Sequence, residues 1–176
     1  MKKQEITANK IVKGKKSTYE KLDNEIKLFI QDGETEYQNL NLKTSISFIN
    51  FLSNKLLIIQ AIKKGIPYSV FDLIQNITPF TISDWASYLD LSSKSLMRYR
   101  QQGKRFRPIH SEKIIEIAEV ANLGLEVFMD AKKFKLWLET PNYSLGNLRP
   151  FDLLKNSYGK EMIIGELTRI DHGILA

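Results

Sequence analysis

The feature that most constrains the fold is a pair of short apolar-patterned segments joined by a turn. They occupy residues 82–107, ISDWASYLDLSSKSLMRYRQQGKRFR, and the turn falls at residues 90–92. Basic side chains and no acidic ones follow the turn: Lys94, Arg98, Arg100, Lys104, Arg105 and Arg107. This layout is typical of a helix-turn-helix DNA reader with a basic second helix and a basic loop after it.

Side chains around the turn favour the same interpretation. Ala86 is small where the two helices of such a motif cross closely, and Leu91 can plug the turn. Leu96 and Tyr99 would face inward from the second helix. Asp90 stands where glycine is common, but aspartate tolerates the left-handed conformation better than most residues. The residues that we expect to contact DNA are Ser93, Lys94, Ser95, Arg98, Arg100, Lys104, Arg105 and Arg107.

In a major groove, Arg98 could pair bidentately with guanine, and the serines could donate to bases or phosphates. The alternative is a helical hairpin whose basic face is merely solvated.

The net charge of +6 is distributed unevenly along the 176 residues. Residues 1–64 carry +5, residues 65–110 carry +3, and residues 111–176 carry −2. This asymmetry suggests nucleic acid at the front of the chain and another partner behind, although such a charge can also serve only solubility.

The residue types that catalysis or metal binding would need do not form recognisable patterns. No cysteine is present, which excludes disulfides and thiolate metal sites and fits a reducing, cytoplasmic location. The two histidines, His110 and His172, lie too far apart for a metal-ligand spacing. There is no phosphate loop, activated nucleophile or paired carboxylate frame. We therefore expect neither catalysis, nor a metal, nor a cofactor, and no apolar run is continuous enough to suggest a membrane span.

Apolar periodicity predicts an all-α fold in three parts. Residues 1–45 form a basic N-terminal extension that we expect to be partly flexible, with a helix from Ser17 to Ile30 and a loop over 31–44. Residues 46–110 form the helix-turn-helix domain, and residues 111–176 form a helical C-terminal domain.

Local capping signals predict where the helices begin and end. The pattern from Ile46 to Lys64 recurs through Ile49, Leu52, Leu56, Ile59 and Ile62. It should bend near Ser53, which can cap a new start. Gly65 can close that helix, and Pro67 suits the first turn of the next. Caps are also expected at Thr81, at Ser111 for a helix running to about Phe128, and at Asp130.

The last fifty residues carry several ordered motifs. They include EVF-x-D at 126–130, Trp-Leu-x-x-Pro-Asn at 137–142, Leu145–Gly146, Pro-x-x-Leu-Leu at 150–154, and Arg-Ile-Asp-His-Gly at 169–173. Together they resemble the C-terminal toxin-binding domain of the Xre/MbcA/ParS antitoxins. The upstream helix-turn-helix lies where that family has its Xre-like DNA-binding domain, so the resemblance covers roughly residues 54–176.

The resemblance implies an antitoxin of a type II toxin–antitoxin pair. Its partner would be a RES-domain toxin that consumes NAD or transfers its ADP-ribose, and the antitoxin would cover the toxin's active site. A homodimer within a larger complex would also repress its own operon at an inverted repeat. The residues that this implies for toxin binding are Trp137, Asn142, Leu145, Arg149, Arg169, His172 and Gly173.

Three positions depart from the family pattern. Asn147 replaces a glycine, Leu148 replaces a basic residue, and Arg149 replaces the threonine or serine before the proline. Asparagine can adopt the glycine conformation, whereas arginine cannot cap the next helix. Arg149 would then either leave the next helix without a cap or make a contact of its own with the partner. The alternative function is a stand-alone transcriptional regulator whose C-terminal part dimerises or binds a small ligand.

Overall fold

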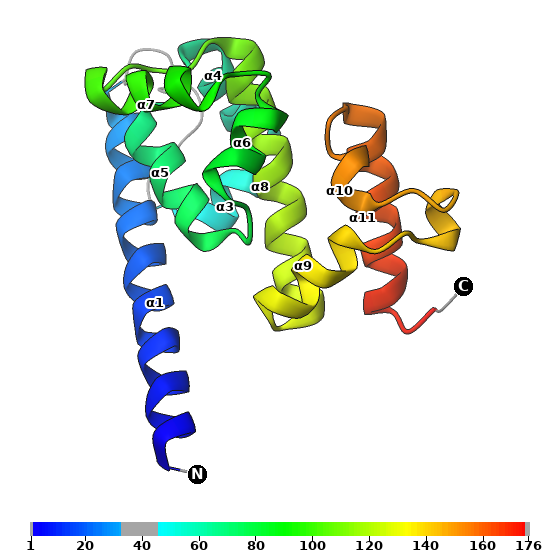
Figure 1. Ribbon diagram of the computed structural model, residues 1–176. Helices are drawn as coiled ribbons and strands as arrows, with labels where there is room; N and C mark the ends of the chain where they lie inside the picture. The colour runs from blue at the N-terminus through cyan, green and yellow to red at the C-terminus, as the bar shows by residue number, and fades with distance from the viewer. Residues whose placement is uncertain (1, 33–45, 175–176) are drawn as a thin grey trace. The chain divides into compact units, whose positions relative to one another are not determined.

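The computed structural model describes residues 2–32 and 46–174, and within them the chain is helical and contains no strand, as predicted. Its helices, together with the 3₁₀ turn η2, are α1 (Lys2–Gln31), α3 (Phe48–Ser53), α4 (Lys55–Lys64), α5 (Tyr68–Ile77), α6 (Ile82–Tyr88), α7 (Ser93–Gln102), α8 (Pro108–Phe128), α9 (Ala131–Glu139), η2 (Tyr143–Leu145), α10 (Pro150–Leu153) and α11 (Ser157–Asp171) (Figure 1). None of these helices combines the length and apolar character that crossing a membrane requires.

The chain divides into two compact units. One consists of residues 1–77 and 97–111, and the other of residues 78–96 and 112–176. We call them the N-terminal unit and the C-terminal unit.

In the N-terminal unit, α1 runs alongside α5 and also packs on α3 (Figure 1). Its buried stripe is the predicted one and contains Leu22, Ile26, Phe29 and Ile30. The helix starts at Lys2, well before the expected Ser17. The predicted loop over 31–44 lies almost entirely outside the described residues.

The helix break near residue 54 differs from the prediction in its cap. Asn54, in an extended conformation, accepts a hydrogen bond from the Leu57 amide at 3.2 Å and so begins α4. Ser53 instead donates its hydroxyl to the Ile49 carbonyl at 3.0 Å within α3. Asparagine is as good a cap as serine, and here it alone has the non-helical backbone that capping requires.

This break also changes which apolar side chains are buried. Three residues of the predicted recurring pattern are exposed, at 49% for Ile49, 60% for Leu56 and 48% for Ile59. The core is formed by Leu52, which belongs to the predicted pattern, and by neighbouring residues: Phe48, Phe51, Leu57, Ile58 and Ala61. The single extended residue shifts the helical phase, so one continuous 3.6-residue period does not describe both helices.

A second correction concerns Ser111, which does not begin a helix. Helix α8 starts earlier, at Pro108, a favourable first position because proline has no amide proton to satisfy. The Ser111 hydroxyl is fully buried, accepts a hydrogen bond from the Ile66 amide at 2.9 Å and donates to the Phe106 carbonyl at 3.3 Å. It thus joins the segment after α4 to the segment after α7.

Gly65 lies at this junction and has the predicted positive φ, 84°. A Cβ there would stand 2.4 Å from the Phe106 carbonyl oxygen. Glycine is therefore needed both for the backbone conformation and for the close approach.

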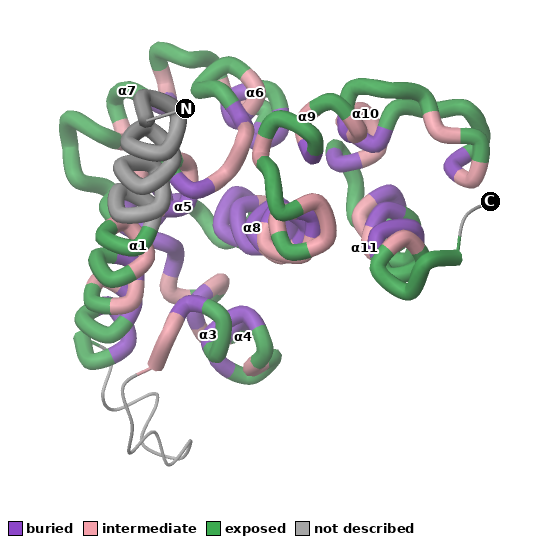
Figure 2. Tube along the Cα trace, turned by 90° about the horizontal axis from the view of Figure 1, so that it is seen from below, coloured by how far each residue is buried: buried purple, intermediate pink, exposed green. Residues whose placement is uncertain are grey.

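The C-terminal unit is built around α8. Figure 2 shows buried residues concentrated along the middle of this helix, where Ile114, Ile117, Ala118 and Ala121 are at most 1% exposed. Gly124 does not interrupt the helix. A Cβ at this position would stand 2.1 Å from Phe134 Cε2, so the glycine makes room for the ring.

Candidate functional site

The turn between α6 and α7 lies where the sequence predicted it. Thr81 and Asp84 form a capping box at the start of α6, in which each side chain accepts from the other residue's amide, at 3.1 and 2.8 Å. Asp90 takes the left-handed conformation, with φ 51°, and the next amide, of Leu91, donates to the Ala86 carbonyl at 2.9 Å. Ser92 then caps α7 by accepting from the Ser95 amide at 3.0 Å.

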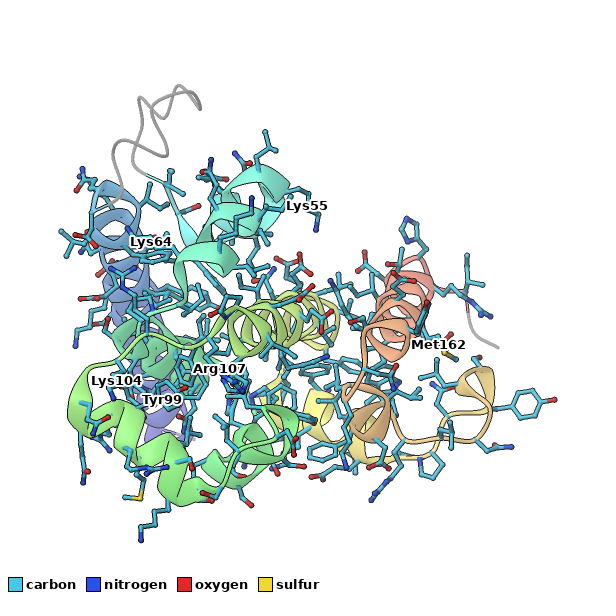
Figure 3. All side chains as sticks on the ribbon, turned by 90° about the horizontal axis from the view of Figure 1, so that it is seen from above. Lys55, Lys64, Tyr99, Lys104, Arg107 and Met162 are labelled. Carbon is cyan, nitrogen blue, oxygen red and sulfur yellow. The ribbon has the colours of Figure 1, made fainter. Side chains whose placement is uncertain are left out.

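The predicted inward and outward faces of α7 are largely as expected. Leu96 is fully buried. Tyr99 is half-buried and stacks on Phe106, with ring centroids 4.5 Å apart and planes at 11° (Figure 3). Of the residues expected to contact DNA, Ser95 is half-buried, and the others are exposed: Ser93, Lys94, Arg98, Arg100, Lys104, Arg105 and Arg107.

Arg105 and Arg107 each contact another side chain of the chain. Arg105 Nη2 lies 2.6 Å from Asp32 Oδ2, and Arg107 Nη2 lies 3.5 Å from His110 Nε2. The sequence offered no signal for the Arg105–Asp32 pair, because the two residues are 73 positions apart.

Trp137, the first of the residues implied in toxin binding, belongs to an aromatic group at the end of α8 and on α9. Trp137 is half-buried and packs 5.6 Å from Phe128 and 6.2 Å from Phe134, measured between ring centroids. Asp130 caps α9, as predicted, by accepting from the Lys132 and Lys133 amides at 2.7 and 3.1 Å. The amides of Lys133 and Lys132 hold the pKa of the Asp130 carboxyl below its usual value.

A tight turn joins α9 to α10. Asn142 Oδ1 accepts from the Ser144 amide at 2.8 Å, and the Asn142 amide donates to the Leu148 carbonyl at 3.1 Å. Gly146 and Asn147 both take positive φ, 69° and 61°, which agrees with the expected tolerance of asparagine. Leu145 is 3% exposed and lies in the core, where it supports the turn.

Arg149 precedes α10 and makes no side-chain cap, as predicted. Its Nε lies 2.7 Å from Asp152 Oδ2. This hydrogen bond and the charge of Asp152 raise the pKa of the already strongly basic Arg149. Half of the Arg149 side chain remains exposed, so its guanidinium stays available at the surface.

Helix α10 packs against α6 within the C-terminal unit. The Tyr88 ring lies 5.4 Å from Phe80 and 5.2 Å from Phe151, between centroids, and its hydroxyl donates to the Phe151 carbonyl at 3.4 Å. Burial, reinforced by nearby carboxylates, raises the pKa of Tyr88. One side of the candidate reader therefore shares a core with the predicted toxin-binding helices.

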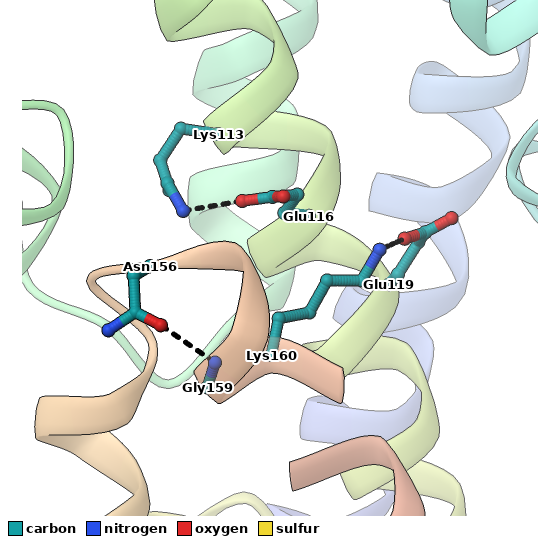
Figure 4. A network of polar contacts seen from close by, with 6 residues as sticks. All are labelled: Lys113, Glu116, Glu119, Asn156, Gly159 and Lys160. Carbon is teal, nitrogen blue, oxygen red and sulfur yellow. Dashed lines mark hydrogen bonds and ion pairs between the residues drawn. The ribbon is translucent and has the colours of Figure 1, made fainter. Parts of the chain in front are cut away.

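Helix α11 is attached to α8 by an ion pair. Lys160 reaches across to Glu119, while Lys113 and Glu116 pair one turn away on α8 (Figure 4). Asn156 caps α11 by accepting from the Gly159 amide at 2.8 Å.

The remaining implied residues lie at the end of α11. Arg169 Nη1 is 3.4 Å from Glu166 Oε2, and the Arg169 side chain is 47% exposed. His172 Nδ1 lies 2.7 Å from the Thr168 carbonyl, so the ring closes the helix end. Gly173 follows with φ 71°, the predicted closing conformation.

Exposed apolar side chains around these residues were not anticipated. Tyr143 is 83% exposed and Leu148 52%, both on the turn before α10; Leu136, on α9, is 67% exposed. Tyr143 and Leu148 follow no helical periodicity, and the only available signal for them was their hydrophobicity within a turn. No cluster of three or more histidine, aspartate or glutamate side chains suited to a metal is found among the described residues.

Comparisons with known proteins agree with this arrangement. A family model described as the antitoxin Xre/MbcA/ParS C-terminal toxin-binding domain matches residues 123–173. An antitoxin Xre of Yersinia enterocolitica serotype O:8 / biotype 1B is 27% identical over 125 residues, covering 70% of this chain and 84% of the relative. An antitoxin Xre of Photorhabdus laumondii subsp. laumondii is 27% identical over 117 residues, covering 65% and 78%.

The matched segment runs from the end of α8 through α9, η2, α10 and α11, and so contains all seven residues implied in toxin binding. The predicted resemblance is thereby confirmed: residues 123–173 match the toxin-binding domain of the Xre/MbcA/ParS antitoxins, and the chain is similar to two antitoxins Xre.

Proposed function

We propose that this antitoxin neutralises a RES-domain toxin by covering the toxin's active site with residues 123–173. The observation that carries the proposal is the match of this segment to a toxin-binding domain. Arg149 and Arg169 supply exposed guanidinium groups on this segment, and such groups can pair with carboxylates at the toxin's active-site cleft. The exposed Tyr143 and Leu148, beside Arg149 in the chain, offer the apolar area that a protein interface needs at its centre.

Co-expression with the neighbouring gene tests the antitoxin role. That gene should arrest growth when expressed alone and should be harmless with this one, and the two products should purify together. The double variant Arg149→Glu, Arg169→Glu should lose at least about 100-fold in affinity for the toxin, because like charges would replace attractive ones.

The matched control is Lys55→Glu with Lys63→Glu, which makes the same charge change on α4 in the N-terminal unit. It should bind and neutralise the toxin normally. A double arginine variant that binds as tightly as the unmodified chain would refute the assigned role of these two residues. A neighbouring product that is harmless alone would instead favour the stand-alone regulator.

We further propose that two copies of the chain bind an inverted repeat upstream of the operon through α7 and the basic loop that follows it. This rests on the turn at Asp90, the capped start of α7 and the exposed basic residues beyond it. Half-sites about one helical turn, roughly 10 base pairs, apart would suit such a dimer.

Lys94→Glu with Arg98→Glu should abolish footprints on the promoter, whereas Lys55→Glu with Lys63→Glu should retain them. Affinity should also fall steeply with salt, since the basic residues displace counterions from phosphates. A promoter with no protected region at any concentration of the unmodified protein would exclude autorepression and leave the antitoxin role standing.

A further inference from the structure

Two cationic side chains converge on one carboxylate in the N-terminal unit. Asp32 directly follows α1, and its Oδ2 lies 2.6 Å from Arg105 Nη2 and 3.5 Å from Lys64 Nζ. Lys64 Nζ also donates to the Phe29 carbonyl at 2.8 Å. Both cations lie over the Phe29 ring, at 4.9 Å for Lys64 and 5.4 Å for Arg105. The hydrogen bond from Arg105 and the charge of Lys64 hold the pKa of the Asp32 carboxyl below its usual value.

The position of Arg105 is set by its backbone. The segment 104–107 joins α7 to α8, and Arg105 forms an isolated antiparallel bridge with Pro67. The next amide, of Phe106, donates to the Ile66 carbonyl at 2.8 Å. The Arg105 side chain lies over the Phe29 ring. Its guanidinium is therefore held in place before any ligand binds.

Asp32, by contrast, is weakly held. Its side chain is 64% exposed, and it follows the C-terminus of α1, where the helix dipole disfavours a negative charge. An exposed ion pair of this kind contributes little to stability and is screened by salt. The local geometry is therefore that of a preformed cation pair with a replaceable anion.

We propose that Lys64 and Arg105 form a binding site for a phosphate of the DNA backbone and that Asp32 occupies this site in the unbound protein. The inference rests on the proposed DNA binding and deepens it. A phosphodiester oxygen pair matches the planar guanidinium fork, and the exposed Lys104 and Arg107 flank Arg105 along the same loop. Asp32 is thus a built-in competitor that lowers affinity for DNA.

Fluorescence anisotropy with a labelled duplex of random sequence tests this on the full chain over a series of salt concentrations. Asp32→Asn removes the competing charge and preserves the shape of the side chain. It should bind about two- to fivefold more tightly at low salt. Arg105→Gln should instead flatten the plot of log K against log salt by about 0.9, the value for one lost phosphate contact.

The matched control is Glu20→Gln, which removes one negative charge from an exposed residue on α1. Its affinity should stay close to that of the unmodified chain. In an Arg105→Gln background, Asp32→Asn should give no increase in affinity, because one of the two cations that would take the phosphate is gone.

The outcomes separate the two proposals. If the unmodified chain binds DNA and Asp32→Asn changes nothing or behaves like Glu20→Gln, the phosphate site is refuted while DNA binding stands. Weaker binding by Asp32→Asn would assign Asp32 a positioning role and would also refute the competitor. If no variant binds DNA at any salt concentration, both proposals fail.

Discussion

The two units each use an ion pair to join helices or loops that are distant in sequence, but the pairs differ in their exposure to water. In the C-terminal unit, the Lys160 and Glu119 side chains are 19% and 13% exposed. In the N-terminal unit, the Arg105 and Asp32 side chains are 37% and 64% exposed. A shielded pair is costly to break because a partner is left in a poorly solvated place, whereas water or another ion can replace an exposed partner.

Backbone packing is close beside both pairs, so exposure to water is what distinguishes them. Beside the first pair, Gly159 lies so close to α10 that a Cβ would stand 2.0 Å from the Leu153 carbonyl oxygen. Beside the second pair, a Cβ on Gly65 would stand 2.4 Å from the Phe106 carbonyl oxygen. An exposed junction fits a surface that exchanges ions.

The largest effect on stability is expected for Gly159→Ala. Because the new methyl group would meet a backbone carbonyl, which cannot rotate away, we expect a loss of about 3 kcal/mol in the free energy of unfolding. Gly165→Ala is the control on the same helix, since a Cβ there has nothing within 4 Å. It should stabilise the chain by about 0.5–1 kcal/mol. Urea denaturation measures both, and equal effects of the two variants would contradict the close packing of α11 on α10.

The next largest effect should come from Lys160→Met. Removing the ammonium group leaves the mostly shielded Glu119 carboxylate without this partner, and we expect a loss of about 2 kcal/mol. Adding Glu119→Leu should recover much of that loss, since an apolar pair can replace a buried ion pair. A double variant as unstable as the two single changes added together would argue that the two side chains do not interact.

Arg105→Gln should have a much smaller effect on stability. Its partner is exposed, so the urea midpoint should stay close to that of the unmodified chain while affinity for DNA falls. A large drop in the midpoint would make the Arg105–Asp32 contact structural, and the contrast between the two ion pairs would then disappear.

The smallest effect concerns two aspartates whose pKa values are lowered for different reasons. Neutral backbone amides act on Asp130, whereas cationic side chains act on Asp32. A lowered pKa in the folded state stabilises the fold above the usual carboxyl pKa, and this contribution is lost as the pH falls below about 4. Carboxyl carbon NMR titrations at low and at about 1 M salt should show the pKa of Asp32 rising toward its usual value. The pKa of Asp130 should change less. Equal changes of the two pKa values would contradict the different causes given for the two shifts.

Much of the fold could be predicted because its signals are local. The caps at Thr81 and Asp130, the left-handed turn at Asp90 and the closing glycines at 65 and 173 each depend on residues within one turn of the chain. The buried stripe of α1 follows from helical periodicity alone. The toxin-binding segment was identified in the same way, from an ordered series of short motifs.

The failures share a physical cause. Ser111 looks like a cap in the sequence, but its hydroxyl accepts from an amide 45 positions away. The inner face of α3 and α4 could not be placed because one extended residue, Asn54, reset the helical phase. The exposure of the basic side chains could not be predicted from the sequence either, because it depends on which residues pack nearby in the folded chain.

The sequence by itself therefore determined most helices, the turns and the resemblance to an antitoxin family, because these depend on backbone preference, capping and spacing along the chain. Only the tertiary structure decided what the polar groups do. It placed Asp32 against Lys64 and Arg105, and Lys160 against Glu119, in surroundings of very different exposure. The energy of an ion pair depends on how much water surrounds it, and that quantity is a property of the folded molecule.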